Sequence, residues 1–371
     1  MKSFAVAAAA LFAAMGPVTM AQTHTKCNPL TTKGCPSMQA LGSEAHFYFN
    51  RTDPPFSDKV WDKENQGDIV WGEKGATFII RESGDAPLVQ SNFYMLFGRF
   101  EMIMRAAKGT GIVSTGILQS EDLDEVDWEF LGQSSEAMTN YFGKGNNETY
   151  DRGKEYPMDP SPQEGFHNYT VDWTVDRIQW WLDGNMVREL LPKDALNGTN
   201  YPQTPMNIRI GIWSAGDTKN NAPGVVQWAG GETDFAQGPF TMTVQEIYAK
   251  DYTNAKEYSW DNMDASGDWQ KVKVITEGKS EVTKEIENPS GISAHWKALS
   301  SAAKTGIIAG SLGALALGLL VVAFCCIKQR RVGRKEHELL LAQEHKEAEE
   351  LQEYKKQMQG GRFGLGSHQR V

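Results

Sequence analysis

Between residues 45 and 260, short stretches of alternating apolar and polar residues are separated by Gly, Pro, Asn and Asp. Alternation with a period of two predicts β-strands that bury one face, and the separating residues favour turns. One such stretch, Arg177–Leu182, ends at Asp183-Gly184, a dipeptide typical of tight hairpins. The pattern predicts an all-β fold of many short strands, arranged as a two-sheet sandwich or jelly roll.

A different pattern lies near the C-terminus, where residues 305–327 carry no charge and are mostly apolar. As a helix rising about 1.5 Å per residue, this run would reach roughly 34 Å, enough to cross a bilayer. Five basic residues within 328–335 follow at once, which predicts a type I protein of the plasma membrane. The cytosolic tail, 328–371, should contain a charged helix over 335–358, and the pattern does not indicate its partner.

The N-terminus starts with a basic residue and an apolar run that ends in small residues at Ala21. This pattern is typical of a secretory signal peptide over residues 1–21, and secretion implies an oxidising compartment. We therefore expect Cys27 and Cys35 to form a disulfide within a polar leader over 22–44. Four Asn-X-Ser/Thr sequons are compatible with N-glycosylation: Asn50, Asn147, Asn168 and Asn197.

Composition narrows the class of protein further. The formal net charge is −10, which argues against nucleic acid as a partner. The 371 residues suffice for one large domain with appendages. We expect this domain over 45–270, followed by a stalk over 271–304, where apolar residues become fewer and Lys, Glu and Ser increase. We expect neither a cofactor nor a metal.

The most informative segment for chemistry is Asp124–Phe130, which has acids at every second position. As a strand it would place Glu125, Asp127 and Glu129 on one face and three apolar side chains on the other. Adjacent acids on one face repel one another and shift each other's pKa values, as a general acid beside an ionised nucleophile requires. Glycoside cleavage is the chemistry that most directly uses such a pair of carboxyl groups.

Two other readings of these acids remain open from the residues alone. An acidic strand face can be solvated surface, and clustered acids can bind Ca²⁺ through their oxygens. The spacing lacks the turn residues of a calcium loop, which weakens the second reading. Eleven Trp and eleven Tyr are many for this length, and their flat faces suit sugar rings as well as a core.

Segment 124–132 (DEVDWEFLG) and the motifs around it resemble glycoside hydrolase family sixteen, and within it the fungal Crh family of cell-wall chitin–glucan transglycosylases. The resemblance extends over roughly residues 25–270. The supporting motifs, in chain order, are 111–114, 118–120, 139–145, 167–173, 181–184, 204–206, 211–213 and 228–231.

This resemblance implies a concanavalin-like β-jelly-roll sandwich with a sugar cleft across one sheet. It implies that Glu125 is the nucleophile, Glu129 the proton donor and acid/base, and Asp127 an assisting residue that tunes the pair. The reaction would be a retaining cleavage of chitin, a β-1,4-linked polymer, with transfer to β-glucan or chitin that cross-links the fungal cell wall. A chitinase-type hydrolase and a lectin-like wall-binding protein are the alternatives.

The resemblance also suggests substrate contacts, although every aromatic residue among them can equally belong to the core. A regular strand without an extra residue before Glu129 favours a β-1,4-linked donor. No Ser/Thr-rich stalk or glycolipid anchor signal is visible, so we expect the enzyme at the outer face of the plasma membrane. The expected substrate-binding residues are Glu129, Tyr141, Arg152, Trp173, Arg209, Trp213, Trp228 and Thr233.

Overall fold

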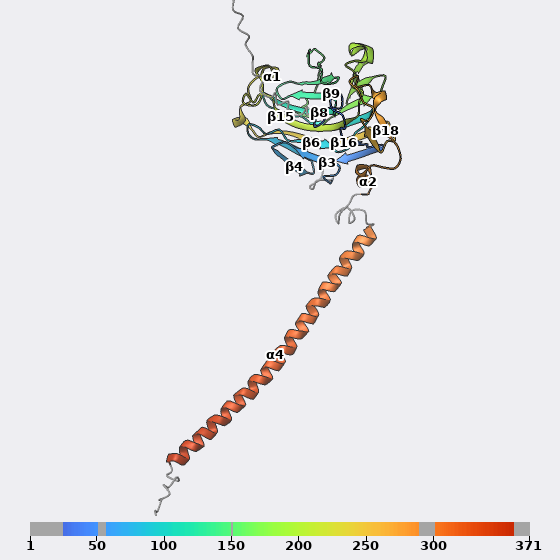
Figure 1. Ribbon diagram of the computed structural model, residues 1–371. Helices are drawn as coiled ribbons and strands as arrows, with labels where there is room; N and C mark the ends of the chain where they lie inside the picture. The colour runs from blue at the N-terminus through green and yellow to red at the C-terminus, as the bar shows by residue number, and fades with distance from the viewer. Residues whose placement is uncertain (1–24, 51–56, 150, 289–300, 360–371) are drawn as a thin grey trace, which may run out of the picture. The chain divides into compact units, whose positions relative to one another are not determined.

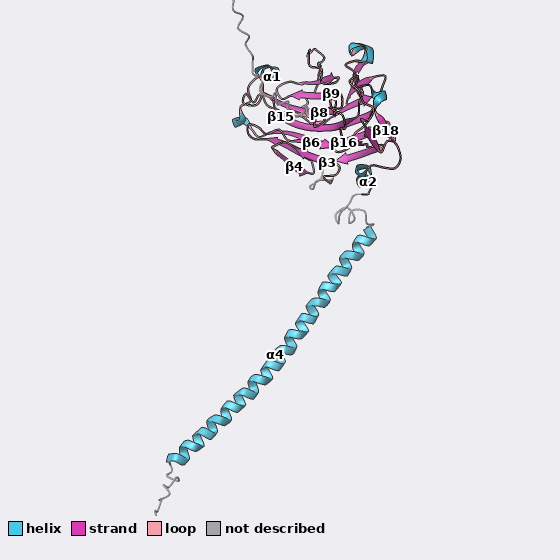
Figure 2. Ribbon diagram, in the orientation of Figure 1, coloured by secondary structure: helices cyan, strands magenta, loops and turns pink. Residues whose placement is uncertain are grey.

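The computed structural model describes residues 25–50, 57–149, 151–288 and 301–359 and divides the chain into two units, 1–290 and 291–371. The expected signal peptide lies outside the described residues. Figures 1 and 2 show the first unit as layered strands and the second as one helix.

Two antiparallel sheets form a sandwich, and a third, small sheet joins the leader to the end of the unit. The first sheet has the order β11 (Lys154–Pro157), β10 (Glu136–Phe142), β9 (Glu125–Leu131), β8 (Ile112–Ser120), β15 (Met206–Ser214), β6 (Leu88–Ser91) and β3 (Trp61–Glu64). The second has the order β14 (Asn185–Leu190), β13 (Ile178–Leu182), β12 (His167–Trp173), β7 (Gly98–Arg105), β16 (Phe240–Asp251), β5 (Gly75–Ile80) and β4 (Asp68–Gly72), with β2 (Glu44–Tyr48) paired to β16. The third has the order β1 (Met38–Gln39), β17 (Glu257–Ser259) and β18 (Lys273–Ile275).

Helices are short in the first unit. The α-helices are α1 (Pro223–Trp228), α2 (Glu281–Glu287) and, in the second unit, α4 (Ser301–Gln359). The 3-10 helices are η1 (Pro192–Asp194), η2 (Leu196–Gly198), η3 (Phe235–Gln237) and η4 (Trp269–Lys271).

The core of the sandwich follows from the period of two. In β9 the side chains of Val126, Trp128 and Phe130 are fully buried between the sheets, and so are Phe100 and Met102 of β7. Burial of these side chains supplies the main favourable free energy that holds the sheets together. The expectation of a two-sheet β-sandwich is confirmed.

The hairpin expected after Arg177–Leu182 is also present. Asp183 and Gly184 have φ values of 47° and 78°, in the left-handed region, and they connect β13 to β14. Two successive positive φ values are what a tight hairpin turn requires, and the twist of such a turn matches that of the strands.

The first unit extends beyond the boundary expected at residue 270. The disulfide between Cys27 and Cys35 is present as expected, and the leader that contains it packs against α2. The hydroxyl of Ser280 caps α2 and donates a hydrogen bond of 2.8 Å to the carbonyl oxygen of Ala40, while Val282 is buried. The structure therefore places the first part of the expected stalk in the compact unit, because its few apolar side chains dock on the leader.

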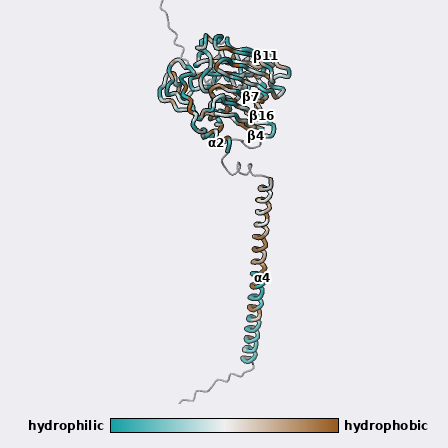
Figure 3. The backbone as a smooth tube through the Cα atoms, turned by 90° about the vertical axis from the view of Figure 1, so that its right-hand side faces the viewer, coloured by the Kyte–Doolittle hydropathy of each residue, from teal (hydrophilic) through white to brown (hydrophobic). Residues whose placement is uncertain are grey.

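Helix α4 runs unbroken through the apolar run 305–327 and the charged segment 335–358. Figure 3 shows the change from apolar to polar along it. Within the described residues, the helix Ala303–Met358 is the one that is long and apolar enough to cross a membrane. Length and composition alone support that statement, so insertion into a bilayer stays a prediction.

Candidate active site

Strand β9 places its three acids on the outer face of the first sheet, because its apolar residues occupy the core. Two indole groups fix the strand against the second sheet. Trp128 donates a hydrogen bond of 3.2 Å to the carbonyl oxygen of Thr170, and Trp180 donates one of 3.0 Å to the carbonyl oxygen of Asp127. These two bonds hold β9 on its buried side, because Thr170 belongs to β12 and Trp180 to β13, two adjacent strands of the second sheet.

Strand β8 supplies the neighbours of the acids. In its register with β9, Gln119 pairs with Glu125 and Thr115 pairs with Glu129. The amide of Gln119 donates a hydrogen bond of 2.6 Å to Oε2 of Glu125. This bond orients the carboxyl group, and an ionised carboxylate held in this way can act as a nucleophile.

Glu129 has the opposite electrostatic setting. Its burial raises its pKa, and the negative charge of Glu125 raises it further, to about 8. Glu129 is therefore protonated at neutral pH and can donate a proton. Two carboxyl groups with different protonation states on one strand are the arrangement that acid-assisted glycoside cleavage uses.

Asp127 lies between these two acids and is almost completely buried. Burial raises its pKa well above the ordinary value, and the charges of Glu125 and Glu129 and a hydrogen bond with Glu125 add to this. Among the described residues, no N–H or O–H group donates to either carboxyl oxygen of Asp127. A protonated Asp127 supplies its own donor, and Glu125 is the acceptor beside it. The raised pKa of Asp127 therefore favours its neutral form beside Glu125.

Strand β15 brings a buried cation to the same face. Arg209 pairs with Ile117, which in turn pairs with Asp127. Its Nε donates a hydrogen bond of 3.1 Å to Oδ1 of Asn207. Burial lowers the pKa of Arg209, while the charges of several acids, including Glu125, raise it. The guanidinium group therefore adds positive charge near the ionised carboxylate.

Two aromatic groups lie at diagonal corners of the site. Trp213 and Trp228 stack with ring centroids 6.3 Å apart and an interplanar angle of 27°. Trp228 is 39% exposed and Trp213 is mostly buried. At the other corner Phe142 pairs with Glu125, and the guanidinium group of Arg152 lies 4.7 Å from the Phe142 ring centroid. The acids are thus flanked by flat surfaces of the kind that sugars stack on.

Comparison with known proteins decides the family. The profile described as Glycosyl hydrolases family 16 matches residues 57–230. Crh-like protein 2 of Botryotinia fuckeliana is 44% identical over 359 residues, which cover 95% of this chain and 77% of that protein. Crh-like protein 3 of Aspergillus fumigatus is 45% identical over 335 residues, which cover 89% of each chain. The chain belongs to the Crh-like group of glycosyl hydrolase family 16.

A solved structure supports the same assignment. A Crh5 transglycosylase in complex with NAG is similar to this Crh-like chain, with a TM-score of 0.63 and 44% identity. The match covers 67% of this chain and all of that one. The family and the enzyme class expected from the motif are confirmed: the Crh-like chain is a glycoside hydrolase or transglycosylase.

The structure does not bring every expected residue of the Crh-like site to the acids. Tyr141 pairs with Val126 and packs in the core beneath Arg188, and Trp173 is fully buried in the core. The hydroxyl of Thr233 donates a hydrogen bond of 3.2 Å to the carbonyl oxygen of Thr110, so it holds a loop in place. The described residues contain no group of three or more His, Cys, Asp or Glu side chains arranged to hold a metal, so the calcium reading gains no support.

Two residues of the Crh-like site were missed by sequence reasoning. Gln119 lies in a motif that the family resemblance includes. The alternation of side chains along β8 could have placed Gln119 on the same face of the sheet as Glu125. Asp124 was read only as the start of the acidic segment. Its buried carboxylate accepts hydrogen bonds from the backbone N–H groups of Lys144 at 2.9 Å and Gln203 at 2.7 Å, and so joins three loops beside the site.

Replacing Asp124 with Ala should lower the free energy of unfolding by about 2–4 kcal/mol, because it leaves buried N–H groups without an acceptor. Urea unfolding of residues 22–290 measures this. Asp234→Ala is the matched control, since exposed Asp234 caps only η3 and its loss should cost at most about 1 kcal/mol. Equal decreases in the free energy of unfolding for both variants would show that Asp124 does not join the loops.

Proposed function

We propose that this Crh-like enzyme cleaves chitin with retention of configuration and transfers the released chain to β-glucan or chitin acceptors, which cross-links the fungal cell wall. The observation that carries the proposal is the pairing on β9 of a protonated Glu129 with Glu125 held by Gln119. The donor class is supported by the related Crh5 transglycosylase, which was solved in complex with NAG.

In the first step Glu129 gives its proton to the glycosidic oxygen while Glu125 attacks the anomeric carbon. The carbon–oxygen bond to the leaving sugar breaks, and a covalent glycosyl ester forms on Glu125. In the second step Glu129, now ionised, takes a proton from an acceptor hydroxyl, which attacks the same carbon and releases Glu125. A sugar hydroxyl gives transfer, and water gives hydrolysis.

The test is a transfer assay with a chitin oligosaccharide as donor and a fluorescent β-1,3-glucan oligosaccharide as acceptor. The proposal predicts labelled products that grow in mass and contain donor sugar. Shortened donor without labelled product would leave a chitinase-type hydrolase, and binding without turnover would leave a lectin. Repeating the assay with a fluorescent chitin oligosaccharide as acceptor separates the two acceptor classes.

We also propose that the Trp213–Trp228 pair is a platform for the sugar chain, because Trp228 exposes its ring on the active face. Trp228→Ala should raise the KM for the chitin donor about tenfold, equivalent to about 1.4 kcal/mol, with a smaller effect on kcat. Tyr48→Ala is the matched control, because Tyr48 is 43% exposed on β2 of the other sheet. An unchanged KM for Trp228→Ala would remove the pair from the substrate site.

Anchoring in the plasma membrane is a further part of the proposal. Residues 305–327 of α4 would cross the bilayer, with the basic residues that follow on the cytosolic side and the catalytic unit outside. Alkaline carbonate extraction of cell membranes tests this. The full chain should stay in the membrane pellet, and release of the chain into the supernatant would contradict the proposal.

A further inference from the structure

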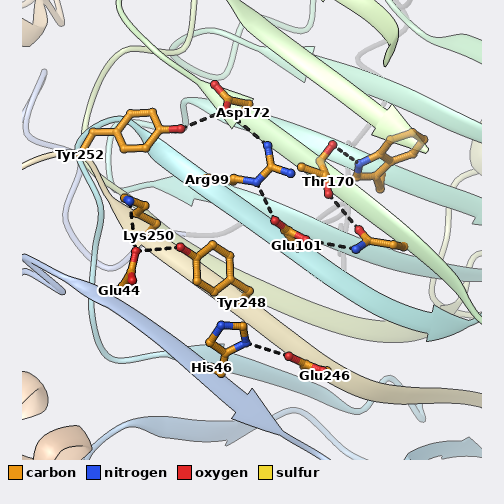
Figure 4. Close-up of polar contacts among 12 residues, drawn as sticks. Glu44, His46, Arg99, Glu101, Thr170, Asp172, Glu246, Tyr248, Lys250 and Tyr252 are labelled. Atoms are coloured by element: carbon orange, nitrogen blue, oxygen red, sulfur yellow. Dashed lines mark hydrogen bonds and ion pairs between the residues drawn. The ribbon is translucent and has the colours of Figure 1, made fainter. Parts of the chain in front are cut away.

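A groove with a volume of about 560 Å³ crosses the outer face of the second sheet and is lined from β2, β7, β12 and β16. In β7 the side chains of Phe100, Met102 and Met104 are buried, so the alternate residues Arg99, Glu101 and Ile103 face outward into this groove. Figure 4 shows its polar floor. Because the sandwich lies between, the groove is separate from the site that contains Glu125 and Glu129.

The charges in the groove are paired with one another. Arg99 lies 2.6 Å from Glu101 and 3.5 Å from Asp172, and Lys250 lies 3.0 Å from Glu44. Four acids line the groove against one Arg and one Lys, so a phosphate or another anion would be repelled. Paired side chains still offer oxygen and nitrogen atoms for hydrogen bonds, and this suits a neutral ligand with many hydroxyl groups.

One wall of the groove is an aromatic surface held in a fixed position. The Tyr248 hydroxyl donates a hydrogen bond of 2.9 Å to Glu44, and its ring centroid lies 4.6 Å from that of His46. Tyr248 pairs across the sheet with Glu101, in the centre of the groove. A flat ring beside paired polar groups is the combination that binds a sugar, whose faces are apolar and whose edges are polar.

Asn168, the first residue of a sequon, lines this groove. Its Oδ1 accepts a hydrogen bond of 2.8 Å from the hydroxyl of Thr170, and its Nδ2 donates one of 3.1 Å to Glu101. That bond uses one of the two amide hydrogens, so the other can be replaced by a sugar without breaking it. Asn168 is half-buried on a strand, unlike the exposed asparagines of the three other sequons: Asn50, Asn147 and Asn197.

We propose that Asn168 carries an N-linked glycan whose first N-acetylglucosamine units lie in this groove against Tyr248. The bond from Nδ2 to C1 of the sugar forms as the C1–oxygen bond to the pyrophosphate of a lipid-linked oligosaccharide breaks. The amide loses one proton, and the lipid pyrophosphate leaves with the electron pair. The glycan then covers the outer face of the second sheet, so polysaccharide binds only on the face that carries β9.

Native-state deglycosylation of the full chain, made in a yeast secretory host, tests the proposal. Peptide-N-glycosidase converts each glycosylated Asn into Asp, so mass spectrometry of peptides follows every site separately. Release at Asn168 should be about tenfold slower than at Asn147 and Asn197, because it requires the glycan to leave the groove first. Tyr248→Ala should accelerate release at Asn168 alone, while Trp228→Ala, which removes an exposed ring away from the groove, should not.

Three results would overturn the proposal. An unmodified Asn168 in the secreted chain would leave the groove without this occupant. Equal release rates at Asn168, Asn147 and Asn197 in the folded protein would show a glycan that projects into solvent. An unchanged rate at Asn168 in Tyr248→Ala would show that slow release reflects burial of the amide rather than packing of the sugar. Denatured chain, in which all sites should react alike, is the internal control.

Discussion

Replacing Glu125 with Gln is expected to lower the rate of donor cleavage by about 10⁴-fold or more, because a neutral amide cannot form the glycosyl ester. The side chain keeps its shape, and the amide of Gln119 can still donate a hydrogen bond to it. Thermal stability should change little, since Glu129 and Asp127 beside it are already mainly protonated and the replacement keeps the size of the side chain. The rate of donor cleavage and the melting temperature of residues 22–290 measure both effects.

The matched control for Glu125→Gln is Glu189→Gln. Glu189 is exposed on β14, the edge strand of the second sheet, and accepts a hydrogen bond of 2.6 Å from Gln179. Its replacement should leave the cleavage rate unchanged. An active Glu125→Gln enzyme would contradict the assignment of the nucleophile. A Glu125→Gln enzyme that loses both activity and fold would not separate catalysis from stability, and Glu125→Asp then supplies the second test, with low activity in a folded chain.

Cleavage of chitin is expected to fall about tenfold per pH unit above pH 8, because the first step needs the proton of Glu129. The pKa of this carboxyl is raised from its ordinary value of 4.5 to about 8, first by burial and then by the charge of Glu125. The protonated form therefore predominates at neutral pH and is lost as the pH rises through about 8. The pH profile of kcat/KM for the chitin donor measures this limb.

Glu129→Gln completes the same prediction. It should lower cleavage of chitin about 10²- to 10⁴-fold and remove the alkaline limb, because no proton is left to lose. A donor with an activated leaving group needs no proton, so formation of its glycosyl ester should be much less affected. An alkaline limb that persists in Glu129→Gln, or one near pH 4.5 in the wild type, would contradict the role of Glu129.

The alternation of side chains along a β-strand explains why the central part of the site could be predicted from the sequence. The segment Asp124–Phe130 alternates acids with large apolar residues, so any sheet with one buried face must present the acids on the other. The raised pKa of Glu129 also follows from this pattern, because it needs only burial and a nearby like charge. The disulfide of Cys27 with Cys35 was predictable for another reason, since no other cysteines lie between residues 22 and 304.

The other features of the site and the boundary of the first unit could not be predicted, because they depend on strand register and on contacts between distant segments. Tyr141 faces the core because it pairs with Val126, and no local pattern states that register. The side chain of Asp124 is buried, although it lies just before the alternating residues of β9. Leu123, with a φ of 68°, interrupts the extended backbone in front of it. The first unit includes α2 because Ser280 and Val282 dock on a leader that lies some 240 positions earlier in the chain. Composition near residue 280 resembles a stalk and does not show that contact.

The most direct measurement of the central claim is the mass of Glu129→Gln enzyme after mixing with a chitin oligosaccharide that carries an activated leaving group. This variant forms the glycosyl ester without acid help but lacks the base that activates an acceptor, so the intermediate should accumulate. The intact mass should rise by that of the transferred oligosaccharide, and peptide mapping should place the addition on Glu125. No addition, or an addition on a residue other than Glu125, would contradict the mechanism.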